Sequence, residues 1–213
     1  MLNSLLGRVV GGIALTVVVV LLVVDWGRDV PELSPLSRDA RVLAFGDSLT
    51  HGTGASAEAS YPAVLSRRLD RPVINAGRPG ETSGEGRERL AATLDRTKPD
   101  LVLLCHGGND FLQDHEPSRI RRNVRAMIEQ ARERGIEVVL IGVPSRGITL
   151  ATAPLYEDLA AEFDVPLVRG VIGDILAEPT LRSDRVHPND KGYRNLVDAV
   201  HEVLVESGAV TRP

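Results

Sequence analysis

The stretch VLAFGDSLT, residues 42–50, sets a pattern that the rest of the chain repeats. Its first four residues are apolar and Gly46 follows them, which is typical of a short buried strand that ends in a sharp turn. The turn brings two polar side chains, Asp47 and Ser48, to the carboxyl end of the strand. Taken alone, these residues are also typical of a plain turn in which Asp47 or Ser48 only caps the next helix.

Similar apolar runs follow and alternate with segments of helical periodicity. Further strands are expected at residues 72–75, 101–105, 138–141 and 166–168. Helices are expected at residues 61–69, 83–96, 117–134, 154–163 and 189–205, with Gly135 as the C-cap of the third. Strands that alternate with helices indicate an α/β fold, a three-layer α/β/α sandwich around a parallel sheet. In such sheets, ligands bind beyond the carboxyl ends of the strands.

The composition is that of an ordinary globular protein. Hydrophobic residues make up 43% and charged residues 25%, so the chain is not a disordered one. A formal net charge of −4 gives no sign of nucleic-acid binding. Cys105 is the single cysteine, which excludes an internal disulfide framework and a cysteine-based zinc site. The total of 213 residues predicts one folded domain, at residues 41–213.

The amino-terminal segment departs from this composition. Residues 9–24 read VVGGIALTVVVVLLVV, and counting back through Leu5 gives about 20 residues, enough to cross the hydrocarbon core of a membrane. The run ends without the small residues of a cleavage site, and Trp26 stands where an interfacial aromatic belongs. The sequence therefore favours residues 1–24 as an uncleaved transmembrane helix over a removed signal peptide.

The flanking charges predict the orientation of this segment. Arg8 precedes the apolar run, whereas the flank after it mixes acidic and basic residues. The positive-inside rule then places the amino terminus in the cytoplasm. The predicted location is the cytoplasmic membrane, single-pass, with the folded domain facing the periplasm or exterior; secretion after signal cleavage is the alternative. Residues 25–40 hold two prolines and no sustained period, so we expect a short extended linker.

Four loops carry polar residues that fit one chemistry. They are GDS at 46–48, NAGRPGET at 75–82, GGND at 107–110 and SDRVHPN at 183–189. In the last, Asp184 and His187 are three residues apart, so the carboxylate can hold the imidazole Nδ1 and leave Nε2 free as a base. A nucleophile, a base with its acid, and glycine or amide donors for an oxyanion are the components of acyl transfer.

The blocks GDSLT (46–50), NAGRPGETS (75–83), GGND (107–110) and DRVHPN (184–189) resemble the SGNH, or GDSL, hydrolases. The resemblance runs from about Arg41 to Val205 and is strongest to the branch of bacterial multifunctional acyl-CoA thioesterase, lysophospholipase and arylesterase enzymes. It implies a flavodoxin-like fold with a five-stranded parallel sheet. It also implies an esterase, lysophospholipase or thioesterase that works without metal or cofactor.

The resemblance further implies a role for each site residue. Ser48 would be the nucleophile, His187 the general base and Asp184 its partner. The Ser48 N–H, the Gly80 N–H and the Asn109 carboxamide would form the oxyanion hole. Gly80 is preferred over Gly77 because it lies five residues after Asn75 and abuts the helix start, with Gly77 as the fallback.

The expected partner is a small ester or a lipid-derived acyl substrate. Two other functions stay open: a carbohydrate O-deacetylase on the same fold, and a membrane-anchored binding protein that has lost turnover. With 3% aromatic residues, an acyl groove must be lined by aliphatic side chains, and four candidates are Ile148, Leu150, Leu155 and Ile172.

The other reactive side chains have simpler readings. Cys105 is expected to be a core thiol and His106 a structural histidine. Together they depart from the branch, which commonly has an acidic–apolar pair before the glycines, and this bears on the shape of the acyl pocket. The remaining histidines lack the carboxylate cluster of a metal site. The arginines of residues 119–134 are read as a solvated helix face, with contact to anionic lipid headgroups as the alternative.

Overall fold

The structure is a computed structural model that describes residues 30–145, 147 and 150–211. The predicted transmembrane helix at residues 1–24 lies outside these described residues. Among the helices within them, none has both the length and the apolar character that a membrane crossing requires.

A parallel five-stranded sheet forms the centre of the domain. Its strands are β1 (Val42–Gly46), β2 (Val73–Gly77), β3 (Leu101–Cys105), β4 (Glu137–Ile141) and β5 (Leu167–Val168), in the order β2-β1-β3-β4-β5. The prediction of a parallel α/β sheet is therefore confirmed. Gly46 pairs with Gly77 on one side and with Cys105 on the other, so the loops after β1, β2 and β3 start at the same level.

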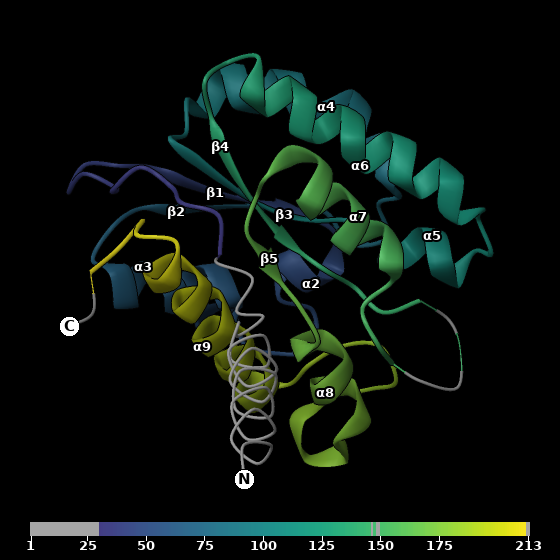
Figure 1. The fold of residues 1–213 in the computed structure, drawn as a ribbon. Helices are drawn as coiled ribbons and strands as arrows, with labels where there is room; N and C mark the ends of the chain where they lie inside the picture. Colours follow the sequence, from purple (N-terminus) through teal and green to yellow (C-terminus); the bar gives the residue numbers. More distant parts are fainter. Residues whose placement is uncertain (1–29, 146, 148–149, 212–213) are drawn as a thin grey trace, which may run out of the picture.

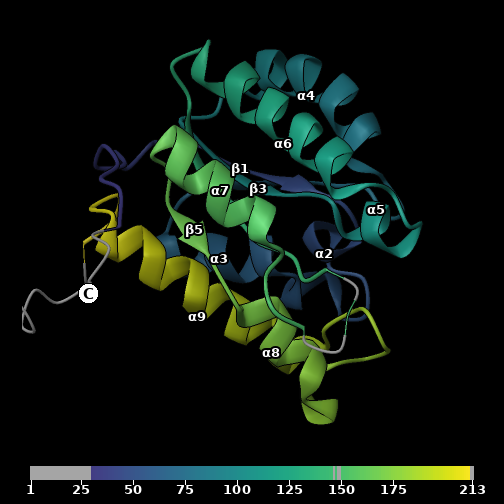
Figure 2. The ribbon, with the colours of Figure 1, turned by 45° about the vertical axis from the view of Figure 1, so that its right-hand side comes forward.

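Helices cover both faces of the sheet, as Figures 1 and 2 show. One face carries α4 (Ser83–Thr97), α6 (Pro117–Arg132) and α7 (Pro154–Phe163), and the other carries α3 (Tyr61–Leu69) and α9 (Asp190–Glu206). The helix α8 (Val171–Ala177) packs against α9. This is the three-layer arrangement that the alternating pattern predicts.

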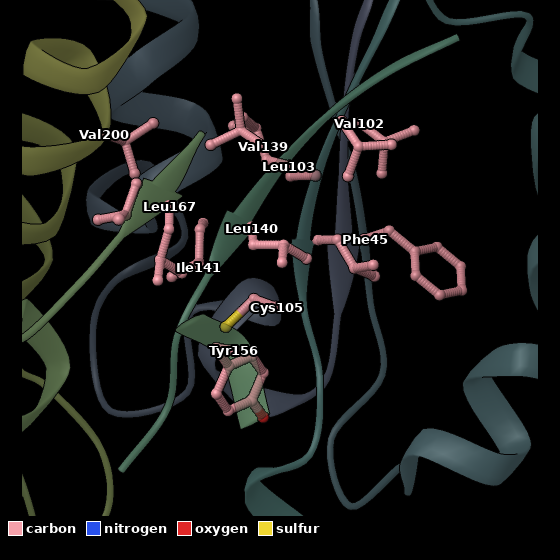
Figure 3. Close-up of a cluster of buried hydrophobic side chains, with 14 of the residues drawn as sticks. Phe45, Val102, Leu103, Cys105, Val139, Leu140, Ile141, Tyr156, Leu167 and Val200 are labelled. Atoms are coloured by element: carbon pink, nitrogen blue, oxygen red, sulfur yellow. The ribbon is translucent and has the colours of Figure 1, made fainter. Parts of the chain in front are cut away.

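The core lies between these layers. All five residues of β1 and of β3 are buried, because both strands have a neighbour on each side and helices above and below. Figure 3 shows Leu103 of β3 beside Val139 and Leu140 of β4, with Cys105 in the same cluster. The expectation that Cys105 is a core residue is confirmed, since its side chain is fully buried.

The sequence analysis missed the shortest elements. These are α2 (Ser48–His51), α5 (Gly108–Leu112), α8, and the 3₁₀ turns η1 (Ala57–Ala59) and η2 (Pro179–Leu181). A single helical turn or two shows too little of a 3.6-residue period to be recognised. The α6 helix also ends at Arg132, two residues earlier than predicted, and the amide of Gly135 donates to the Arg132 carbonyl at a φ of +69°.

Residues 30–40 run along the folded domain without regular structure. The amides of Leu33 and Leu36 donate to the carbonyls of Ser207 and Ala209, each over 2.8 Å. The guanidinium of Arg71 donates to the Ser37 carbonyl over 2.7 Å. The segment expected as a linker is thus attached to the end of the chain beyond α9 and to the α3–β2 connection.

Candidate active site

Ser48 stands at the point where β1 gives way to α2. Asp47 caps that helix, because its Oδ1 accepts a hydrogen bond of 3.0 Å from the Leu49 amide. The side-chain oxygen of Ser48, the first residue of α2, lies 3.0 Å from Nε2 of His187. The capping role that the plain-turn reading allowed therefore belongs to Asp47, and the Ser48 hydroxyl faces a base.

The loop before α9 holds His187 in place. Its Nδ1 lies 2.8 Å from Oδ2 of Asp184, and Oδ1 of Asp184 accepts the amides of Val186 and His187, each over 2.8 Å. Burial raises the pKa of Asp184, but the hydrogen bonds from the imidazole and the two amides outweigh it and leave the pKa below its usual value. The carboxylate stays ionised and orients the ring so that Nε2 meets Ser48.

Two backbone amides at the site have no acceptor. Within the described ranges, the N–H groups of Ser48 and Gly80 donate to no protein oxygen. Gly80 lines the pocket at a φ of +81°, and a Cβ there would meet nothing within 4 Å. Gly77, the fallback, ends β2 against α2, where a Cβ would lie 2.1 Å from the His51 nitrogen. The structure thus brings Gly80 to Ser48 and leaves Gly77 in the packing below.

Asn109 joins the two loops. Its Nδ2 donates to the Glu81 carbonyl over 3.0 Å and to Oδ2 of Asp47 over 3.2 Å. Asp47 is 1% exposed, and burial raises the pKa of its carboxyl above the usual value. The sequence analysis missed both partners, since a contact across 62 residues leaves no local pattern; the one signal was that Asp47 adjoins Ser48.

A pocket of about 720 Å³ opens over these groups. Its apolar lining includes Phe111, Leu112, Val143, Leu150, Ile172 and Leu176. Leu112 and Leu150, at 50% and 38% exposure, are the exposed large hydrophobic side chains within the described part of the chain. Their exposure marks the pocket rim as an apolar surface rather than a closed wall.

Two of the four groove residues that the sequence suggested are found there. Leu150 and Ile172 line the pocket, while Ile148 lies outside the described residues. Leu155 was wrong: near the start of α7 it packs into the core with 6% exposure. Neither Cys105 nor His106 lines the pocket, so the departure at these positions contributes no side chain to its wall.

The remaining candidate residues lie in the buried interior or on the surface, away from the pocket. Burial raises the pKa of the Cys105 thiol well above its usual value. His106 is buried as expected, yet among the residues that the structure describes neither of its ring nitrogens has a hydrogen-bond partner. On α6, Arg125 pairs with Glu129 and with Glu162, so part of the arginine face is occupied by ion pairs. Within the described part of the chain, no group of three His, Cys, Asp or Glu residues suits a metal ion.

Comparisons with known proteins identify the family of the chain. The sequence model of the GDSL-like Lipase/Acylhydrolase family matches residues 44–194. Thioesterase 1/protease 1/lysophospholipase L1 of Escherichia coli K12 is 34% identical over 156 residues, which are 70% of this chain and 75% of that protein. Esterase TesA of Pseudomonas aeruginosa is 33% identical over 177 residues, 76% of this chain and 87% of its own length.

A solved structure shows the same fold. The crystal structure titled TesA superposes with a TM-score of 0.70 and 27% identity, and it covers 77% of this chain and 97% of its own. The matched region contains all four loops of the site, because residues 44–194 run from β1 into α9. The chain therefore belongs to the GDSL-like lipase/acylhydrolase family of ester-bond hydrolases.

Proposed function

We propose that this chain is a serine hydrolase that cleaves carboxylic ester or thioester bonds, with Ser48 as nucleophile, His187 as general base and Asp184 as its partner. One observation carries the assignment. The chain of contacts from Ser48 Oγ to His187 Nε2 at 3.0 Å, and from His187 Nδ1 to Asp184 at 2.8 Å, is that of a nucleophile held by an oriented base.

The reaction has two halves. Nε2 of His187 takes the Ser48 proton while Oγ attacks the substrate carbonyl carbon, which forms a tetrahedral oxyanion. Collapse of that intermediate breaks the bond to the leaving alcohol or thiol, and His187 returns the proton to it. Water then adds to the acyl-enzyme by the same route and releases the acid and Ser48.

The oxyanion receives donors that the fold holds ready. Within the part of the chain that the structure describes, the amides of Ser48 and Gly80 have no protein acceptor to give up, which supports their assignment. Asn109 is the third donor, but its Nδ2 already contacts two acceptors. Because the contact to Asp47 Oδ2 is the longer at 3.2 Å, the oxyanion takes over that hydrogen, and the Glu81 contact keeps the carboxamide in place.

The pocket favours an acyl group that is longer than acetyl. Its volume of about 720 Å³ and its aliphatic wall fit a hydrocarbon chain, and the exposed rim residues Leu112 and Leu150 extend that wall outward. Relatives that carry the names thioesterase, lysophospholipase and esterase are consistent with lipid-derived acyl substrates. We therefore place the carbohydrate O-deacetylase and the turnover-free binding protein behind this assignment.

Two measurements test it together. A fluorophosphonate probe should label wild-type protein at Ser48, and p-nitrophenyl esters from acetyl to palmitoyl, with an acyl thioester, should be hydrolysed. Ser48→Ala should remove labelling and lower kcat by about 10⁴-fold or more. The matched control is Ser118→Ala, an exposed serine of α6. Hydrolysis of acetyl esters alone would support the carbohydrate O-deacetylase. A folded protein that the probe does not label would support the binding protein without turnover.

We further propose that residues 1–24 tether the enzyme to the cytoplasmic membrane, with the hydrolase domain outside. The support is the uncharged run of residues 9–24 and the arginine before it. In cells, the full chain should sediment with membranes and be digested by protease added to spheroplasts. Recovery of a shortened, membrane-free protein from the medium or periplasm would instead establish cleavage and secretion.

A further inference from the structure

We infer that Glu81 is a positioning residue for the oxyanion hole: pinned by Arg89 and flanked by His106, it fixes both the Gly80 amide and the Asn109 carboxamide. The inference rests on the proposed function of this site. It assigns a task to a buried charged cluster that lies outside the pocket and that the triad does not use.

Glu81 connects the two donors through its own backbone. Its amide group follows directly after Gly80, and its carbonyl accepts the hydrogen bond from Asn109 over 3.0 Å. A shift of the Glu81 backbone therefore moves one donor and releases the other. Its amide donates to the Arg78 carbonyl over 3.2 Å, and its side chain is 7% exposed, so the carboxylate contacts inside the protein add a second restraint on that backbone.

Arg89 of α4 binds the carboxylate in a bidentate manner through the Nε–Nη2 edge of its guanidinium. Nε donates to Oε1 over 2.7 Å, Nη2 donates to Oε2, and Nη2 also donates to the Ala76 carbonyl over 3.1 Å. The guanidinium carbon lies 4.1 Å from the ring centroid of Phe45 in β1. The loop that carries Gly80 is thus tied to α4, β1 and β2, and a bidentate pair is the strongest geometry for such a tie.

His106 closes the other side of the carboxylate. Its side chain is fully buried, and Nε2 lies 3.3 Å from Oε2 of Glu81, although not in hydrogen-bond geometry. The ring packs 5.3 Å from the Phe45 centroid, and a Cβ at Gly86 would come within 2.5 Å of Nε2, so the ring has no room to retreat. His106 is also where the sequence departs from the likeness, which makes this wall a feature of the present chain.

The charge of Glu81 persists wherever the enzyme can work. Burial raises the pKa of its carboxyl, but the neighbouring His106 and Arg89 outweigh burial and lower it to about 2. Removing the charge leaves Arg89 as a buried cation without its partner, and the loop must shift to hydrate it. Because oxyanion donors act on the transition state, the loss belongs in kcat and not in KM.

The test compares Glu81→Gln with a matched control on ester hydrolysis. Glu81→Gln should lower kcat by about 10-fold or more and leave KM within about two-fold. Glu162→Gln removes the carboxylate charge of another arginine-paired glutamate, on α7 and outside the pocket lining, and should behave as wild type. Wild-type kcat in Glu81→Gln overturns the inference.

A double-mutant cycle separates positioning from general structural damage. If Glu81 acts through the donors, Glu81→Gln in an Asn109→Ala background should cost less than about three-fold in kcat. Fully multiplicative losses overturn the inference. If Glu81→Gln does not fold, Arg89→Lys decides: it keeps the charge but loses the fork, and should lower kcat at constant KM. An inactive wild type whose Ser48 does not react with fluorophosphonate refutes the proposed function instead.

Discussion

The two halves of the site are built in opposite ways. The half around Asp47, Glu81 and Asn109 has two buried carboxylate residues, Asp47 and Glu81, and is joined by contacts between loops that are far apart in sequence. The half around Asp184 and His187 is one turn, closed by hydrogen bonds between residues two and three positions apart. The side chain of Asp184 is 53% exposed, against 7% for Glu81.

The difference follows from what each half must do. Donors for a developing oxyanion are effective only when they are fixed before the reaction, so they belong on elements that the core immobilises. An imidazole that takes and returns a proton needs only one orienting carboxylate within reach. We therefore expect substitutions in the half around Asp184 and His187, the outer half, to lower activity without lowering stability. Substitutions in the half around Asp47, Glu81 and Asn109, the inner half, should lower both.

The largest expected effect breaks activity alone. Asp184→Asn should lower kcat by roughly 10⁴-fold, because an amide does not hold the same imidazole tautomer. The midpoint of urea unfolding should shift little, since the side chain is half exposed and solvent screens most of the stability that its lowered pKa implies. Asp198→Asn, an exposed aspartate on α9, is the control. A parallel loss of stability would show that the outer turn supports the fold and would end the distinction.

The inner half should respond in both measurements. Asn109→Ala should lower kcat by about 100-fold or more, because it deletes an oxyanion donor. It should also reduce the free energy of unfolding by about 1–3 kcal/mol, because the buried residues Glu81 and Asp47 lose a hydrogen-bond donor. Steady-state kinetics and urea titration check the two effects. A purely kinetic effect would contradict the proposed construction.

The same contrast explains what the sequence could reveal. The Asp184–His187 pair can be predicted from the sequence because both residues lie in one turn. The fold can be predicted because buried parallel strands are short apolar runs. The contacts of Asn109 with Asp47 and Glu81 exist only after β1, β2 and β3 align at Gly46, Gly77 and Cys105. Long-range polar contacts of this kind leave no periodic pattern in the sequence. The alternation of strands and helices that predicts the sheet therefore does not predict these contacts.

The same reasoning accounts for the misjudged residues. Leu155 was placed in the groove because it is aliphatic, but the direction of a side chain at the start of a helix depends on how that helix docks. His106 was expected as a structural histidine and is buried, but no described residue forms a hydrogen bond with either of its ring nitrogens. Packing details of this kind follow from neighbours that only the fold supplies.

A smaller effect sharpens the comparison through pH. A carboxyl whose pKa is lower in the folded than in the unfolded state adds stability above the unfolded pKa and loses it as the pH falls through the folded one. For Glu81 that window runs from an ordinary value of 4.5 down to about 2. Glu81→Gln should therefore be destabilised relative to wild type by about 2 kcal/mol at pH 7, allowing for solvent screening. The difference in free energy of unfolding between wild type and Glu81→Gln should become smaller below pH 4.5, which urea titrations at several pH values would show. A difference that does not change with pH would mean that the charge of Glu81 contributes nothing to stability.

The smallest effect concerns the pocket rim, which belongs to neither half of the site and does not contact the reacting atoms. The backbone of Leu150 packs against α8, because a Cβ at Gly173 would lie 1.8 Å from the Leu150 carbonyl oxygen. Leu150→Ala removes aliphatic surface that is already 38% exposed. We expect kcat/KM to fall by about two- to five-fold for long-chain esters, since each buried methylene is worth about 0.8 kcal/mol. Acetyl ester turnover serves as the internal control, because an acetyl group ends at Ser48 and leaves the rim empty. An equal loss for both chain lengths would mean that Leu150 supports the site itself, and the rim would then belong to the inner half.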